Sequence, residues 1–169
     1  MSARLSRPIS VRRLNKEERV SVEATEEERT SIADALDLIA IHSFTADVIL
    51  RPWKKEGVRV EGTVTADVVQ PCIVTLDPVP STVNEEFNIR LHPDAAPSAE
   101  VNVDPEAEDP PELLETEMVD VGAIVLEHFA LGLDPYPRAP GAVFENEADE
   151  PEEEPSPFAV LEALKKQPN

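Results

Sequence analysis

The feature that most constrains the fold is an alternation of apolar and polar residues over residues 58–68. Successive side chains of a β-strand point to opposite faces, so this alternation predicts a long strand with one buried and one solvated face. The buried face would carry Val58, Val60, Gly62, Val64, Ala66 and Val68, and the solvated face Arg59, Glu61, Thr63, Thr65 and Asp67. Other elements must then cover the apolar face.

Neighbouring segments predict the strands that pair with this one. Residues 44–53 have the composition of a strand, and the turn at residues 54–57 ends in glycine, which predicts a hairpin. Further strands are expected at residues 8–14, 18–24 and 83–91.

The stretch after Pro71 is expected to continue the sheet. Cys72, Val74 and Leu76 extend the pattern of buried positions, and residues 77–80 (Asp-Pro-Val-Pro) are expected to form a stiff turn. Cys72 is interpreted as a small buried apolar residue.

A first helix is predicted at about residues 26–38. Thr25 and Glu28 have the spacing of a capping box, in which each side chain bonds the backbone amide of the other residue. The helix would bury an apolar stripe made of Ile32, Leu36 and Ile39.

Two more helices are predicted towards the C-terminus. Asp120 is a plausible N-cap of the first, and Gly132 is placed to end it in the left-handed conformation. The second covers residues 156–169 and would carry Phe158, Leu161 and Leu164 on one face. The sequence therefore predicts an α+β fold, an antiparallel β-sheet with packed helices.

Charge divides the chain into a folded part and an acidic part. Residues 1–91 carry 12 Lys or Arg and 15 Asp or Glu, whereas residues 92–169 carry 3 and 20. We expect a β-rich folded body at residues 1–92, followed by an acidic proline-rich loop at residues 93–113. Residues 114–139 are expected to form a helix with a Pro-Tyr-Pro segment that packs on the body. An acidic linker at residues 140–155 and a C-terminal amphipathic helix at residues 156–169 complete the chain. The acidic connections are expected to be partly disordered.

The net charge of −20 narrows the class of partner. A negative field repels nucleic acid and membrane surfaces and attracts basic proteins. The longest apolar run, at residues 121–126, is far shorter than the roughly 20 residues that cross a bilayer. A single cysteine, Cys72, fits a reducing compartment. We therefore expect a cytoplasmic protein with no membrane partner.

The residues offer no convincing catalytic or metal site. His42, His92 and His128 have no metal-ligand spacing among themselves or with Cys72. We expect no catalytic residue, no cofactor and no metal, and hence a protein that is not an enzyme.

One basic cluster is a candidate for RNA binding. Arg51, Lys54, Lys55 and Arg59 flank the predicted hairpin turn, and Trp53 lies near its tip, where a base can stack on it. An ordinary charged hairpin tip is the alternative interpretation. The predicted C-terminal helix also leaves two alternatives open, because its apolar face can dock on its own sheet or enter a partner's groove.

Four stretches resemble one protein family and occur in that family's order. They are residues 70–79 (QPCIVTLDPV), 119–122 (VDVG), 131–138 (LGLDPYPR) and 156–165 (SPFAVLEALK). With these motifs the chain resembles the large ribosomal RNA subunit accumulation protein family (YceD-like), in the form usual among alphaproteobacteria. Many relatives carry Cys-x-x-Cys in the first stretch, but here the two positions are Val69 and Cys72, so the resemblance implies no metal site.

The resemblance implies a non-enzymatic ribosome-biogenesis factor that supports accumulation or processing of large-subunit (23S) ribosomal RNA. The expected partner is a large-subunit ribosomal protein or a pre-ribosomal particle, and the resemblance also allows the 23S precursor as a partner. Direct RNA binding through the basic hairpin is the alternative, and a hydrolase acting on RNA is a third. Candidate partner-binding residues are Asp134, Pro135, Tyr136, Pro137, Arg138, Phe158, Leu161 and Leu164.

Overall fold

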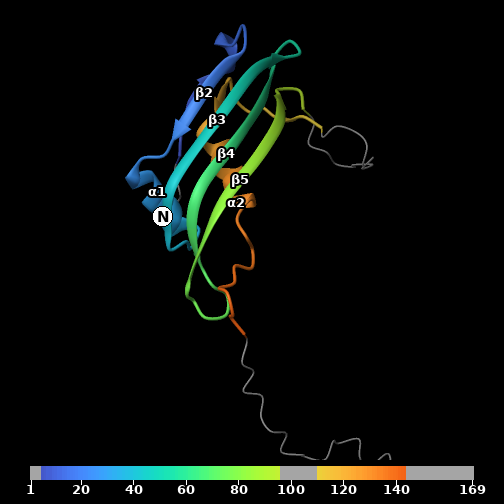
Figure 1. Cartoon of the computed structure of the whole chain (residues 1–169). Helices are drawn as coiled ribbons and strands as arrows, with labels where there is room; N and C mark the ends of the chain where they lie inside the picture. Colours follow the sequence, from blue (N-terminus) through green and yellow to red (C-terminus); the bar gives the residue numbers. More distant parts are fainter. Residues whose placement is uncertain (1–4, 96–109, 144–169) are drawn as a thin grey trace, which may run out of the picture.

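The computed structural model describes residues 5–95 and 110–143. Its main feature is a five-stranded sheet in the order β2-β3-β4-β5-β6 (Figure 1). The strands are β2 (Glu18–Glu23), β3 (Ala40–Trp53), β4 (Gly57–Pro71), β5 (Pro78–His92) and β6 (Glu112–Leu113). Neighbours pair antiparallel, except that the short β6 runs parallel to β5. The expected antiparallel sheet is therefore mixed at one edge.

A second, two-stranded sheet pairs a strand near the N-terminus with the strand that precedes α2. β1 (Pro8–Ser10) pairs with β7 (Met118–Asp120). The predicted strand at residues 8–14 is thus too long, because the chain turns into a 3-10 helix at Val11–Arg13. Strand β2 matches its prediction within one residue.

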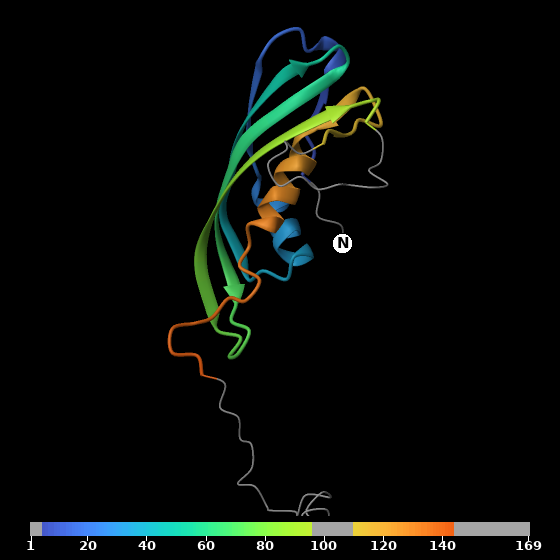
Figure 2. The same ribbon diagram turned by 90° about the vertical axis from the view of Figure 1, so that its right-hand side faces the viewer.

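Both helices, α1 (Glu26–Ala35) and α2 (Val121–Leu131), cover the same face of the curved sheet (Figure 2). The predicted capping box starts α1, since the Glu28 amide donates to Thr25 Oγ1 at 3.2 Å and the Thr25 amide donates to Glu28 Oε2 at 2.9 Å. Asp120 caps α2, and its Oδ1 accepts from the amides of Gly122 and Ala123. The α+β class is confirmed.

The core lies between the helices and the inner face of the sheet. The predicted buried face of β4 is confirmed, because Val58, Val60, Val64 and Ala66 are fully buried. Two ring contacts join the layers: Phe44 meets Phe129 edge-on at 4.9 Å between centroids, and Phe87 stacks on His128 at 4.6 Å. The outer face of the sheet, which the helices leave uncovered, therefore keeps its polar side chains in solvent.

The predicted hairpin between β3 and β4 is confirmed, with a positive φ at Lys54 (52°) in its turn. Two predictions between β4 and β5 are wrong in detail. After β4 the chain turns through residues 72–77, so Leu76 is 75% exposed and does not continue the buried pattern, although Cys72 is buried. Residues 78–80 are not a turn but the start of β5.

Two helix-end predictions are also wrong. Helix α1 ends at Ala35, so Ile39 lies beyond it and is 51% exposed. Gly132 caps α2 with φ −81°, which is right-handed. A glycine is needed there for space, because a Cβ would lie 2.8 Å from Val83 Cγ1 and would overlap the Glu85 side chain. The predicted helix at residues 156–169 lies outside the described residues.

The described helices are short. Helix α2 spans 11 residues, and no helix in residues 5–95 or 110–143 is long and apolar enough to cross a membrane.

Gly62 tests whether the inner face is tightly packed. A Cβ at this position would lie 2.7 Å from Phe87 Cζ and 2.9 Å from the Asp47 carbonyl oxygen. Because overpacking of a core typically costs 1–3 kcal/mol, Gly62→Ala should lower the free energy of unfolding by about 1–3 kcal/mol in urea denaturation. The neighbouring outward variant Thr63→Ala should cost clearly less. Equal losses for the two variants would contradict this account of the packing.

Candidate functional site

The outer face of the sheet carries a row of three arginines near the β3–β4 turn. In the strand register Arg51 is directly opposite Arg59, and Arg59 is directly opposite Arg90. Arg51 and Arg59 are thus neighbours, as the hairpin placed them, whereas Arg90 was not in the sequence-based candidate. Its register position on β5 is set by long-range strand pairing, which the local sequence does not display.

Glutamates and an asparagine lie against the first two arginines. Arg51 Nε donates to Glu17 Oε2 at 2.9 Å, and Arg51 also pairs with Glu61. Arg59 Nη2 lies 3.0 Å from Glu61 Oε1, and its Nε donates to Asn88. The hydrogen bond from Arg51 lowers the pKa of Glu17. These pairs offset much of the positive charge that a phosphate group would otherwise meet.

Trp53 lies at the same end of the outer face and is half-buried. The Lys54 Nζ atom lies 4.3 Å from its ring centroid, and Arg90 Cζ lies 5.6 Å away. His92 meets the ring edge-on at 5.9 Å between centroids. A base that stacked on Trp53 would compete with the lysine for the ring face. Lys55, the last residue of the cluster, is exposed at the turn.

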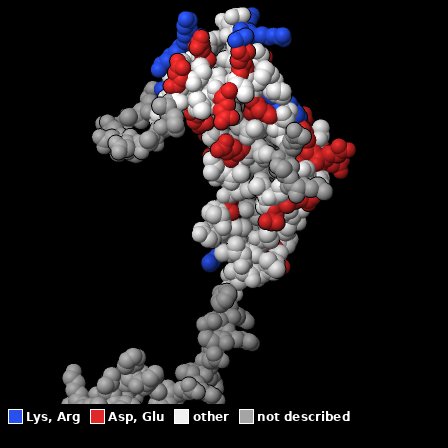
Figure 3. All heavy atoms as spheres, turned by 180° about the vertical axis from the view of Figure 1, so that it is seen from behind, with Lys and Arg blue, Asp and Glu red and all other residues white. Residues whose placement is uncertain are grey.

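Charge is unequally distributed over the molecule. In the view from the helix-covered side, Lys and Arg side chains gather mainly at the end that carries the β3–β4 turn (Figure 3). Asp and Glu side chains lie both among these basic side chains and along the rest of that surface (Figure 3). The basic end is thus a local feature of a strongly acidic chain.

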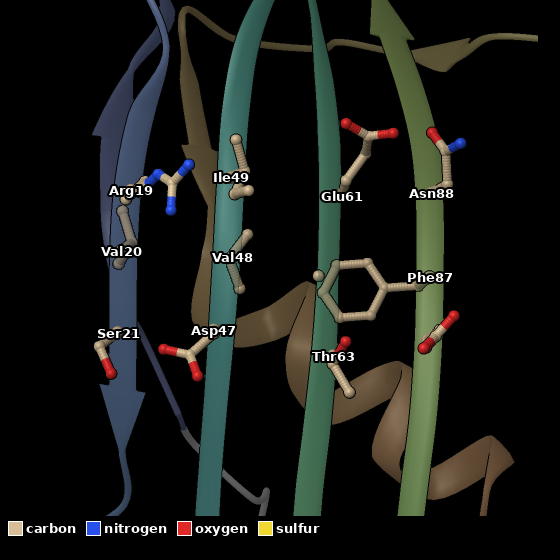
Figure 4. A pocket seen from close by; sticks show the side chains of 12 residues that line it. Arg19, Val20, Ser21, Asp47, Val48, Ile49, Glu61, Thr63, Phe87 and Asn88 are labelled. Atoms are coloured by element: carbon tan, nitrogen blue, oxygen red, sulfur yellow. The ribbon is translucent and has the colours of Figure 1, made fainter.

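Next to the arginine row, a groove of about 1000 Å³ crosses the outer face from β2 to β5 (Figure 4). We call it the outer groove. Its floor is the row Val20, Val48, Gly62 and Phe87, in which the side chains of the two valines and the phenylalanine point inward. One wall is the row Arg19, Ile49, Glu61 and Asn88, and the other is the row Ser21, Asp47, Thr63 and Glu86.

The outer groove carries two carboxylates with no ion pair. Among the described residues, the side chains of Asp47 and Glu86 have neither a salt bridge nor a hydrogen bond, whereas Glu61 pairs with Arg51 and Arg59. The alternation had placed Glu61 on the solvated face, but it gave no sign of the groove. A groove across four strands depends on their register, which a single strand's sequence does not contain.

The segment at residues 134–138, a sequence-based candidate for partner binding, is held against the far end of β4. Gln70 Nε2 donates to the Asp134 carbonyl oxygen, and the Ile73 amide donates to that of Pro137, both at 2.9 Å. Pro137 is buried, but Tyr136 is 71% exposed. Pro135 and Arg138 are exposed beside it. The other candidates, Phe158, Leu161 and Leu164, lie outside the described residues, so the structure does not place them beside this segment.

Cys72 fastens the same segment from the turn after β4. Its Sγ accepts hydrogen bonds from the amides of Ala139 at 3.3 Å and Val74 at 3.4 Å. The Ala139 amide, followed by Thr75, lowers the pKa of the thiol from 9.0 to about 6. Because the side chain is fully buried, we interpret this thiol as a structural group that reagents do not reach easily.

The part of the chain that the structure describes contains no group of three His, Cys, Asp or Glu side chains placed to hold a metal ion. The described surface carries ion pairs, hydrogen-bonding groups and the exposed aromatic side chain of Tyr136.

Comparison with known proteins identifies one family. The family model described as Large ribosomal RNA subunit accumulation protein YceD matches residues 60–165, which is more than half of the 169-residue chain. The matched range begins within β4 and includes β5, α2 and the segment at residues 134–138. No curated protein and no solved structure matches the chain.

The lowered pKa of Cys72 predicts a pH-dependent contribution to stability. A thiolate favoured in the folded chain adds stability above the unfolded pKa of about 9, and this contribution is lost as the pH falls to the folded value of about 6. The free energy of unfolding of the wild type relative to Cys72→Ser should therefore decrease steadily from pH 9 to pH 6. Urea denaturation under reducing conditions measures it. A difference that stays constant with pH would contradict the assignment of a thiolate.

Proposed function

Since the chain belongs to the large ribosomal RNA subunit accumulation protein (YceD) family, we propose that it is a non-enzymatic ribosome-biogenesis factor. It supports accumulation of large-subunit (23S) ribosomal RNA by binding a basic large-subunit ribosomal protein or a pre-ribosomal particle. It works in the cytoplasm, where the subunit is assembled.

The observation that carries this choice of partner is the pairing of the hairpin arginines with glutamates. Affinity for RNA depends on cations that neutralise phosphates and release counterions. Arg51 and Arg59 already share Glu61, and Arg51 also contacts Glu17. The chain as a whole has a charge of −20. The net charge attracts a basic protein, whereas for RNA the described residues concentrate basic side chains mainly near the β3–β4 turn (Figure 3).

The C-terminal part of the sequence strengthens this preference. Residues 92–169 have a net charge of −17. Complementary charge raises the rate of encounter with a basic protein and disfavours competing polyanions. The exposed Tyr136, in a segment held by β4, provides an aromatic anchor of the kind that dominates binding energy at protein interfaces.

Direct RNA binding is the second candidate, and the row of three arginines favours it. Arg51, Arg59 and Arg90 lie opposite one another on three adjacent strands. Neighbouring strands are about 4.8 Å apart, so the row presents cations over about 10 Å, close to Trp53. In this mode RNA replaces the glutamates as the partner of the arginines.

A complementation experiment distinguishes the two modes. Depleting the protein from its source cell should lower the amount of 23S RNA relative to the small-subunit RNA. The variant R51A/K54A/K55A/R59A should restore the wild-type ratio, because the proposed partner binds acidic surface elsewhere. Quantitative RNA electrophoresis measures the ratio, and protein levels are matched by immunoblot.

A variant that is stably expressed but fails to restore the ratio would favour direct RNA binding over binding of a basic protein. A ratio that does not change on depletion would contradict the proposed function itself.

A further inference from the structure

The outer groove has the dimensions of an extended peptide. Its two walls are two residues apart along each strand, which corresponds to about 7 Å. It crosses four strands, a width of about 14 Å. An extended chain rises about 3.3 Å per residue, so four or five residues span the groove from β2 to β5.

The charges in the groove are arranged for a cation on one wall. Glu61, on the wall nearer the β3–β4 turn, forms ion pairs with Arg51 and Arg59. On the opposite wall Asp47 and Glu86 are exposed and have no ion-pair partner among the described residues. A basic side chain in the groove is therefore repelled by the arginines and attracted to these two carboxylates.

The neutral residues of the groove suit the rest of a long basic side chain. Ile49 is half-buried beside Glu61 and offers an apolar surface to the methylene groups of lysine or arginine. Thr63 lies between Asp47 and Glu86 in the strand register and carries a hydroxyl group that can donate or accept. Figure 4 shows these side chains lining the groove.

We propose that the outer groove binds an extended Lys- or Arg-rich segment of the chain's protein partner, with Asp47 and Glu86 accepting its cations. The inference rests on the proposed function for the class of partner and adds the surface that recognises it. Asp47 and Glu86 lie two strands apart, about 10 Å. Basic residues at alternate positions of an extended segment project the same way about 7 Å apart, and their flexible side chains close the difference.

The free carboxylates also decide against RNA in this groove. Phosphate groups placed between the walls would face Asp47 and Glu86 without a compensating cation on that side. The same two residues thus favour a basic peptide and exclude a polyanion.

The test compares two variants of the full chain that have the same net charge. D47N/E86Q removes both carboxylates from the groove. D34N/E127Q removes two exposed carboxylates from α1 and α2, on the other side of the sheet. Both variants change the net charge from −20 to −18. The probe is a fluorescein-labelled peptide of alternating lysine and threonine, and its anisotropy is measured at physiological ionic strength.

D47N/E86Q should weaken binding about five- to ten-fold, as expected for the loss of two exposed ion pairs. D34N/E127Q should change it less than two-fold. Equal effects of the two variants would overturn the proposal, because the peptide would then sense only the overall charge. No binding by the wild type would overturn it as well.

A second readout separates this proposal from the proposed function. In cells depleted of the wild-type protein, D47N/E86Q should fail to restore 23S RNA, whereas D34N/E127Q should restore it. Restoration by both variants would reject the groove as the partner site and leave the proposed function standing. An RNA ratio that does not respond to depletion would instead reject the proposed function.

Discussion

Burial of one face of the β3–β4 hairpin is the interaction on which the rest of the structure depends. The inner residues of β4 are fully buried, and each buried aliphatic side chain stabilises the fold by about 1.5–3 kcal/mol. Helix α2 completes this core through Phe129, which meets Phe44. Because the inner face is committed to packing, its side chains cannot contact a partner, whereas those of the outer face remain exposed.

The outer face carries a row of arginines and, further along the same strands, two carboxylates that have no ion pair among the described residues. At the β3–β4 turn three arginines share one row, and two of them pair with Glu61. Beyond Glu61 the groove carries the free carboxylates of Asp47 and Glu86. In the proposed complex this arrangement would give a basic partner a defined position on the surface, whereas net charge alone would attract it anywhere on the molecule.

Those parts of the structure that depend on local sequence could be predicted. The alternation over β4 predicted which side chains lie on each face of that strand. The capping residues Thr25 and Asp120 predicted where the helices start. Each of these signals lies within a few residues of sequence. The exposure of Leu76 could not be predicted, because the chain turns after β4 where the strand was expected to continue. Gly132 was correctly predicted to end α2, but the reason for a glycine is its close approach to Val83 and Glu85 and not a left-handed conformation.

The candidate site was predicted only where it is local. Arg51 and Arg59 belong to one hairpin, so their proximity followed from the sequence. Arg90 and Glu86 join the site through the pairing of β5 with β4, and that register is fixed by packing of the whole inner face. Asp47 lies in the same hairpin as Arg51, but the groove wall that it forms is completed only by Glu86 on β5.

The proposed binding of a basic protein partner is the central claim to test. Affinity purification of the full chain from native lysate, divided into RNase-treated and untreated halves, tests it most directly. Large-subunit ribosomal proteins should remain bound after RNase treatment, and their complete loss with the RNA would contradict the claim.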